Sequence, residues 1–151
     1  MTATVRAEQA PEATWLAGAE AGTAAPKQLQ LVQFWASWCH SCSGVTTDLS
    51  KIVADYPQTR YLAISTDEVA ANAAGAAERM SGYAQGRAAV MHDSGGEWAQ
   101  RYQVVTVPTV LVLDAQGREL ARFMGHLNAT DLSGVAAALE QAGVDAQGDQ
   151  G

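Results

Sequence analysis

The chain has 151 residues and a formal net charge of −7, from 9 Lys and Arg residues against 16 Asp and Glu residues. A hydrophobic fraction of 48% beside 17% charged residues is typical of one globular domain and argues against disorder. The acidic balance disfavours a nucleic-acid groove or a polybasic membrane patch, so no nucleic-acid partner is predicted. No apolar run approaches the ~20 residues of a membrane-spanning helix.

The first 26 residues differ from the rest of the chain, because they are rich in Ala, Glu, Gly and Thr. They predict a loose lead-in with a short helix at about residues 13–21. A domain is expected at residues 27–146, and a frayed tail at residues 147–151. The start of the chain carries Glu8 and no apolar core, so it is not a secretory signal. Either the protein is cytosolic, or a leader or anchor is absent from this sequence.

Two strands with a helix between them are predicted after the lead-in. Residues 29–36 form an apolar and aromatic run, which indicates a buried strand, and residues 60–65 form a second one. The helix is expected at about residues 39–56, where Pro57 stops it. Its apolar residues recur at helical spacing: Val45, Leu49, Ile52, Val53 and Tyr56.

The next segment predicts two helices around a short strand. Asp67 is the expected N-cap of the first helix, which Gly82 and Gly86 end. Residues 88–91 form the strand, and residues 94–102 form the second helix. The first helix has one apolar face: Val69, Ala73, Ala76, Met80 and Tyr83.

The last part of the domain predicts a hairpin and a final helix. Asn128 or Thr130 caps this helix, and Gly143 ends it. The full order is then β-α-β-α-β-α-β-β-α, which implies an α/β sandwich with parallel pairing and an antiparallel hairpin. The hairpin consists of a strand at 109–113, a turn at 114–117 and a strand at 119–124.

The only two cysteines, Cys39 and Cys42, lie at the predicted junction of a buried strand and a helix. A disulfide stabilises mainly by closing a long loop of the unfolded chain, and this pair closes almost none, so its role is chemical. A helix N-terminus lowers the pKa of a thiol below its usual ~8.5. We therefore expect Cys39, at the exposed helix start, to attack, and Cys42, one turn inside, to resolve the mixed disulfide.

Neighbours of the pair are candidate tuning residues. A cationic His40 favours the Cys39 thiolate and makes the pair more oxidising, whereas a neutral one has little effect. Ser41 also lies between the cysteines, and Trp38 is expected to cover the site. These residues set the reduction potential of the pair within the range of known redox dithiols, about −270 to −120 mV.

The segment FWASWCHSC at residues 34–42, followed later by Val107-Pro108-Thr109, resembles the thioredoxin superfamily. The resemblance covers about residues 28–142 and implies a three-layer α/β sandwich with a mixed sheet. It implies no cofactor besides the redox-active Cys39–Cys42 disulfide. It also implies a cis Pro108 facing the cysteines, with Val107, beside Thr106, free to pair with a bound peptide.

The stretch between Asp67 and Pro108 has room for an extra helix and strand before the cis-Pro strand, and this is similar to the TlpA/ResA-type branch. That branch implies a reductant of disulfides in cytochrome c maturation or metal-site assembly. It further implies a periplasmic or otherwise extracytoplasmic monomer. The implied partners are a protein disulfide or dithiol client and an upstream membrane or soluble thiol that donates electrons.

Three departures from the family pattern matter. Gln33 stands where many thioredoxins carry a buried Asp, and Val45 stands where TlpA/ResA-type proteins often carry a Glu. Both carboxylates are expected proton acceptors for the resolving thiol, and Gln33 can order a water but cannot take a proton. Ser41 replaces the usual Pro before the second cysteine. The missing carboxylates, together with His40, favour a slower or more oxidising pair.

Other interpretations of the cysteines stay open. The dithiolate could carry Cu(I), which soft thiolates select, or the pair could act as a thiol oxidant. A docking domain with an inert pair is a further alternative. A structural zinc site needs four ligands. No second cysteine pair exists and His40, His92 and His126 are scattered, so no metal site is predicted.

Overall fold

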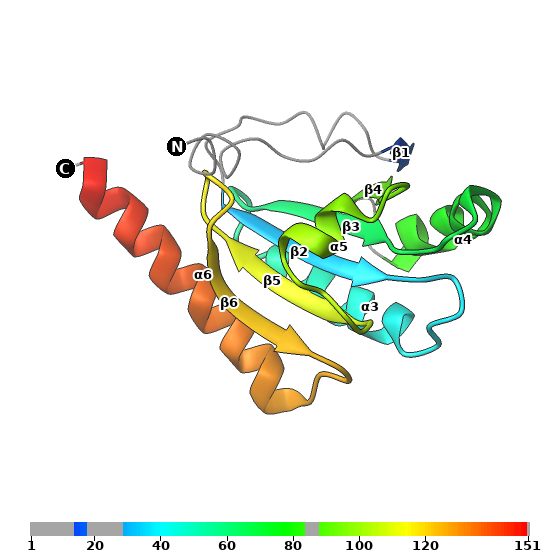
Figure 1. The fold of residues 1–151 in the computed structure, drawn as a ribbon. Helices are drawn as coiled ribbons and strands as arrows, with labels where there is room; N and C mark the ends of the chain where they lie inside the picture. Colours follow the sequence, from blue (N-terminus) through cyan, green and yellow to red (C-terminus); the bar gives the residue numbers. More distant parts are fainter. Residues whose placement is uncertain (1–13, 18–28, 84–87, 151) are drawn as a thin grey trace, which may run out of the picture.

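The computed structural model describes residues 14–17, 29–83 and 88–150, which form a six-stranded sheet flanked by helices (Figure 1). Across the sheet the strands follow the order β1-β4-β3-β2-β5-β6. The strands are β1 (Thr14–Ala17), β2 (Gln30–Trp35), β3 (Arg60–Ser65), β4 (Ala88–His92), β5 (Thr109–Leu113) and β6 (Glu119–Met124). The helices are α3 (Cys42–Val53), α4 (Ala70–Tyr83), α5 (Glu97–Arg101) and α6 (Ala129–Gln150).

The sheet is mixed, as the sequence predicts. β2 runs parallel to β3, and β3 runs parallel to β4. The pairs β2–β5, β5–β6 and β1–β4 are antiparallel. Gln33 pairs with Ala63 on one side and Val110 on the other, so it lies in the middle of the sheet.

Alternating side chains of the strands build two cores, one on each face of the sheet. Leu31 and Trp35 of β2 pack with side chains of α3, α4 and α6. Val32 and Phe34 of the same strand pack on the opposite face, where Trp98 of α5 covers them. This arrangement is the predicted three-layer α/β sandwich, with α4 and β4 inserted before the strand that follows Pro108.

Several predicted elements are confirmed. Strands β3, β5 and β6 have the predicted bounds. β3 and β5 are mainly apolar runs, and β6 lies between the turn at residues 114–117 and Gly125. Asp114 closes the hairpin turn: its N–H donates to the Arg118 carbonyl at 2.9 Å. Asn128 caps α6, since the Asp131 N–H donates to Asn128 Oδ1 at 2.8 Å and the Asn128 N–H donates to Asp131 Oδ2 at 3.0 Å.

The helix predicted at about residues 13–21 is wrong where the structure describes that segment. Residues Thr14–Ala17 form strand β1, which pairs with β4. Backbone pairing at the sheet edge outweighs the helix preference of an Ala-rich segment. Residues 1–13 and 18–26 of the predicted lead-in lie outside the described residues.

The helix predicted from Cys39 begins three residues later, at Cys42, and ends at Val53. Cys39 lies in the preceding turn, where its N–H donates to the Ala36 carbonyl at 3.0 Å. The predicted N-cap role of Asp67 is also wrong. Helix α4 begins at Ala70, and the Asp67 carboxylate accepts hydrogen bonds from Ser37 and Ser65 instead.

The predicted end of α4 at Gly82 and Gly86 agrees with the structure, where the helix ends at Tyr83, and Gly86 lies outside the described residues. The predicted end of α6 is wrong. Helix α6 continues through Gly143 to Gln150, so residues 147–150 of the predicted frayed tail are helical. A glycine inside a helix costs about 1 kcal/mol and does not by itself end the helix. None of the helices in the described ranges is long and apolar enough to cross a membrane.

Candidate active site

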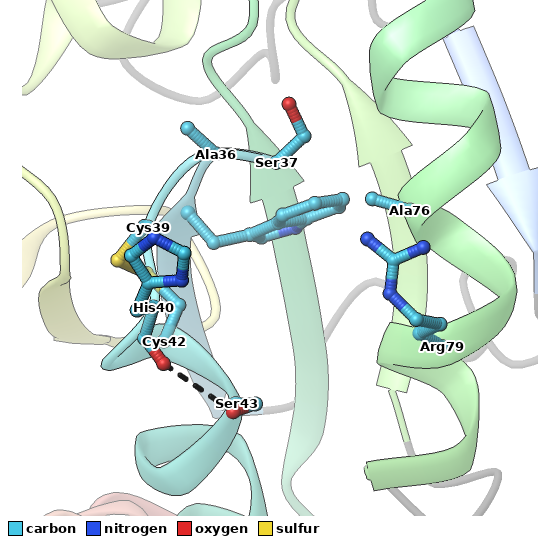
Figure 2. Close-up of a pocket in the computed structure, with 9 residues that line it drawn as sticks. Ala36, Ser37, Cys39, His40, Cys42, Ser43, Ala76 and Arg79 are labelled. Carbon is cyan, nitrogen blue, oxygen red and sulfur yellow. Dashed lines mark hydrogen bonds between the residues drawn. A yellow bond between two sulfur atoms is a disulfide. The ribbon is translucent and has the colours of Figure 1, made fainter.

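Cys39 and Cys42 form a disulfide between the end of β2 and the start of α3 (Figure 2). Their Cα atoms are 5.5 Å apart. Cys42 is 1% exposed and belongs to the core under α3, whereas Cys39 is half-buried at the surface. One sulfur is therefore far more accessible to a visiting molecule than the other.

The start of α3 places its backbone N–H groups close to the pair. Ser41 is the N-cap residue, but its side chain makes no capping hydrogen bond. The first helical bond runs from the Val45 N–H to the Ser41 carbonyl at 3.2 Å. Unpaired N–H groups and the positive end of the helix dipole stabilise a thiolate at such a position.

The predicted tuning residues surround Cys39 at the surface. The Ser41 hydroxyl lies 3.7 Å from the Cys39 sulfur, within hydrogen-bond distance for a sulfur atom. His40 is exposed, and its carbonyl accepts a hydrogen bond from Ser43 Oγ at 3.5 Å (Figure 2). Trp38 is 66% exposed and does not join the core; it lines the cavity at Val107.

Gln33 is fully buried and holds the backbone at Cys42. Its Nε2 donates to the Cys42 carbonyl at 3.2 Å and to Thr46 Oγ1 at 2.8 Å. Its Oε1 accepts a hydrogen bond from the Tyr61 hydroxyl at 2.5 Å. Thr46 and Tyr61 were missed in the sequence analysis, although Thr46 lies one helical turn after Cys42 on α3.

This buried cluster of Gln33, Thr46 and Tyr61 is neutral. Burial raises the pKa of Tyr61 far above its usual 10, so the phenol stays protonated. Val45, for which the resemblance implied a Glu, is 3% exposed and packs in the core. None of these side chains can accept a proton from the Cys42 thiol.

Asp67 fixes the loop that leads from β2 to the cysteines. Its buried carboxylate accepts hydrogen bonds from the Ser37 N–H at 3.0 Å and from the Ser37 hydroxyl at 2.6 Å. It also accepts one from the Ser65 hydroxyl at 2.6 Å. A sequence signal for this role exists: β2 and β3 are parallel, so residues that follow them meet at the same sheet edge.

Val107 and Pro108 lie in the loop before β5, and the peptide bond between them is cis. Within the described part of the chain, neither the N–H nor the carbonyl of Val107 has a hydrogen-bond partner. Thr106 is exposed, and its carbonyl accepts a hydrogen bond from Thr109 Oγ1 at 2.7 Å. A cavity of about 180 Å³ lies between this loop and the cysteine loop. It is lined mainly by apolar side chains: Trp38, Ala99, Val104, Val105 and Val107, with Thr66 and Thr106.

A second cavity of about 180 Å³ lies beside the disulfide, towards α4. Figure 2 shows Cys39, His40 and Cys42 on one side of it and Arg79 of α4 on the other. The sequence analysis missed Arg79, which lies one turn after the buried Ala76. Among the described residues, no group of three or more His, Cys, Asp or Glu side chains is arranged to hold a metal.

A family model for a thioredoxin-like domain matches residues 18–141. The chain belongs to the thioredoxin-like family. The family match and the Cys39–Cys42 disulfide identify the chain as a thiol–disulfide oxidoreductase.

Three similar proteins illustrate the relationship. Thioredoxin-1 of Saccharomyces cerevisiae is 25% identical over 101 residues, which cover 67% of this chain and 72% of the relative. The structure of a secreted Mycobacterium tuberculosis disulfide oxidoreductase homologous to E. coli DsbE is 20% identical and has a TM-score of 0.66, covering 91% of this chain and 98% of that chain. An exposed lipoprotein thioredoxin of Streptococcus pneumoniae is 18% identical, with a TM-score of 0.61, covering 86% and 99%. At these identities, the two structures show a shared fold.

Proposed function

We propose that this oxidoreductase works as a reductant of disulfides in client proteins, with Cys39 as nucleophile and Cys42 as resolving thiol. The observation that carries the proposal is the contrast between a half-buried Cys39 and a Cys42 that is 1% exposed. The Cys39 thiolate attacks a client disulfide, and one client sulfur leaves with its electron pair and takes up a proton. Cys42 then attacks Cys39 in the mixed disulfide, which releases the second client thiol and regenerates the Cys39–Cys42 disulfide.

The surroundings of Cys39 support the reducing direction. A dithiol is a strong oxidant when its reduced, thiolate form is strongly stabilised. Cys39 precedes α3 by three residues, and its sulfur contacts one neutral hydroxyl, that of Ser41. In the described ranges no cationic side chain is hydrogen-bonded to either sulfur. This moderate stabilisation favours a potential near the reducing end of the family range.

The client is expected to bind along the loop of Trp38, Thr106 and Val107. The apolar cavity there accepts a client side chain, and the exposed Trp38 and Val105 supply further apolar surface. The unpaired N–H and carbonyl of Val107 suit an added peptide strand, which brings the client disulfide to Cys39. Backbone recognition of this kind tolerates varied client sequences.

We further propose that the protein works outside the cytoplasm, in cytochrome c maturation or metal-site assembly, and receives electrons from an upstream thiol. The similar structures include a secreted oxidoreductase and an exposed lipoprotein thioredoxin, and this supports the proposal. Fusion of the natural gene product to a reporter that is active only after export tests the location. A reporter that stays inactive would contradict it.

Insulin reduction and redox titration test the reaction. The Cys39→Ser variant should lose insulin-disulfide reduction, whereas Cys42→Ser should accumulate a mixed disulfide with the client. The wild-type pair should titrate below about −200 mV, nearer to thioredoxin than to DsbA. Full activity of Cys39→Ser would overturn the assignment of the nucleophile, and a potential near −120 mV would identify an oxidant.

A further inference from the structure

The cavity towards α4 opens beside the reactive disulfide and is separate from the apolar cavity at Val107. It lies between the end of β2, the first turn of α3 and the middle of α4. Cys39 and Cys42 both line it, so a molecule bound there lies against the pair. A volume of about 180 Å³ suits a group of a few heavy atoms and not a folded segment.

The lining of this cavity carries positive charge without a balancing carboxylate. Arg79 is exposed, and within the described part of the chain it has no ion pair or hydrogen bond. Among the described residues, no Asp or Glu lines the cavity, although acidic residues outnumber basic ones 16 to 9 in the chain. Figure 2 shows the Arg79 side chain beside Ala76 on α4, across the cavity from Cys39, His40 and Cys42. An unpaired guanidinium in this position is available to a ligand carboxylate.

Other donors lie around the same cavity. The first turn of α3, a helix of 12 residues, has no side-chain cap, and its N–H groups favour an anion. Trp35 lines the cavity at 1% exposure, and its indole N–H has no acceptor among the described residues. A buried donor without a partner costs free energy, which a ligand oxygen recovers. Donors thus dominate the polar groups of this cavity.

We propose that this cavity binds the carboxylate of a small anionic thiol, which exchanges electrons with the Cys39–Cys42 pair. The inference rests on the proposed oxidoreductase function and names a substrate class for it. Arg79 and the start of α3 hold the carboxylate while the thiolate of the same molecule attacks the Cys39 sulfur. The Cys39–Cys42 bond breaks, and Cys42 leaves with the electron pair and takes up a proton.

A second molecule of the small thiol completes the reaction. Its thiolate attacks the small-thiol sulfur of the mixed disulfide, and Cys39 leaves with the electron pair and takes up a proton. Two small thiols are thereby oxidised to one disulfide while one protein disulfide is reduced to two thiols. The two protons that the small thiols lose match the two that Cys39 and Cys42 gain.

The test compares three small thiols as reductants of the oxidised protein, with rates expressed per thiolate. The probes are 3-mercaptopropionate, neutral 2-mercaptoethanol and cationic cysteamine. Wild type should react fastest with 3-mercaptopropionate, and Arg79→Gln should lower that advantage about fivefold. The rate with 2-mercaptoethanol should not change, since this probe carries no carboxylate. High salt should reduce the wild-type advantage.

Lys51→Gln is the matched control, because Lys51 is an exposed cation in the last turn of α3, at the other end of that helix. It changes the net charge as Arg79→Gln does and should leave the probe preference intact. The inference is overturned if wild type shows no preference, if Arg79→Gln retains it, or if Lys51→Gln loses it equally. Failure of all three probes to reduce the wild-type disulfide would instead overturn the proposed function.

Discussion

At the scale of single residues, the buried polar cluster under Cys42 is the feature with the largest energetic consequence. Gln33 lies at the centre of the sheet and satisfies the Tyr61 hydroxyl, Thr46 and the Cys42 carbonyl at once. Each group is buried, so none can turn to water if Gln33 is lost. The same hydrogen bonds therefore hold the backbone of the resolving cysteine, Cys42, and stabilise the core.

The Gln33→Leu variant should lose about 1–3 kcal/mol of the free energy of unfolding, because Tyr61 keeps a buried hydroxyl without an acceptor. Urea denaturation measures the loss. Adding Tyr61→Phe should restore part of it, since removing both partners leaves no orphaned group. If the costs of Gln33→Leu and Tyr61→Phe simply add, the two side chains are not coupled in the way described.

The sequence was sufficient to predict the cysteine pair and the burial of Gln33, but not the partners of Gln33. A strand of apolar residues places Gln33 in the core by its position alone. Tyr61 and Thr46 reach it from two other elements, and their contacts depend on strand register and helix packing. The same holds for Arg79, whose position relative to the cysteines depends on how α4 packs against α3.

At the scale of elements, two glycines of α6 report on its length and packing. At Gly143 an added Cβ would meet no atom within 4 Å, whereas at Gly134 it would lie 2.9 Å from the Phe123 ring of β6. Gly143→Ala should therefore stabilise the protein by about 0.5–1 kcal/mol through helix propensity. The free energy of unfolding of Gly134→Ala should be lower than that of Gly143→Ala, because the Phe123 ring must move.

Thermal unfolding of the two alanine variants measures this difference. A destabilising Gly143→Ala would show that α6 ends near residue 143, as the sequence first suggests. That prediction failed because a glycine was taken as a stop although the residues after it are compatible with a helix. The bounds of β3 and β5 were predictable from their mainly apolar runs, and those of β6 from the turn before it and Gly125 after it.

Arg122 of β6 holds the turn after α5 in place through hydrogen bonds, next to the proposed client loop. It donates two hydrogen bonds to the Glu119 carboxylate, at 2.9 and 2.8 Å, and others to the carbonyls of Tyr102 and Gln103. Its hydrogen bonds lower the pKa of Glu119 below the usual 4.5. A lowered pKa stabilises the folded state above pH 4.5, and this stabilisation is lost as the pH falls through the folded-state pKa.

Glu119→Gln should therefore lower the free energy of unfolding at pH 7 by less than about 1 kcal/mol, since the pair is partly exposed. As the pH falls through the lowered folded-state pKa of Glu119, the variant and the wild type should converge. Denaturant titrations at several pH values measure this, with Glu78→Gln, an exposed carboxylate on α4, as the control. A difference that grows as the pH falls would contradict the assignment.

At the scale of the whole molecule, the two faces of the sheet are covered unequally. Three helices pack on one face, while the core of the other face depends on the five-residue helix α5 and the chain after it. Trp98 is 2% exposed, and the Asp93 carboxylate accepts the N–H groups of Trp98 and Ala99 at 3.1 and 3.0 Å. The Trp98 side chain thus provides much of the packing on the α5 face of the sheet.

Trp98→Ala should cost about 3–5 kcal/mol, because it opens a cavity that so short a helix cannot refill. Trp38→Ala, at a 66% exposed residue of the same type, should cost less than about 0.5 kcal/mol. Urea titrations followed by circular dichroism give both values. Equal losses for the two tryptophans would contradict the dependence of that face on α5.

The pairing of β1 with β4 closes one border of the sheet with a segment from the beginning of the chain (Figure 1). Without β1, the outer backbone groups of β4 would be unsatisfied and would offer a template to a neighbouring copy. A shortened protein that starts after Ala17 should therefore be prone to aggregate even though its redox centre is intact. In this molecule, solubility depends on the edge of the sheet, whereas catalysis depends on a central strand, β2, which leads to the cysteines.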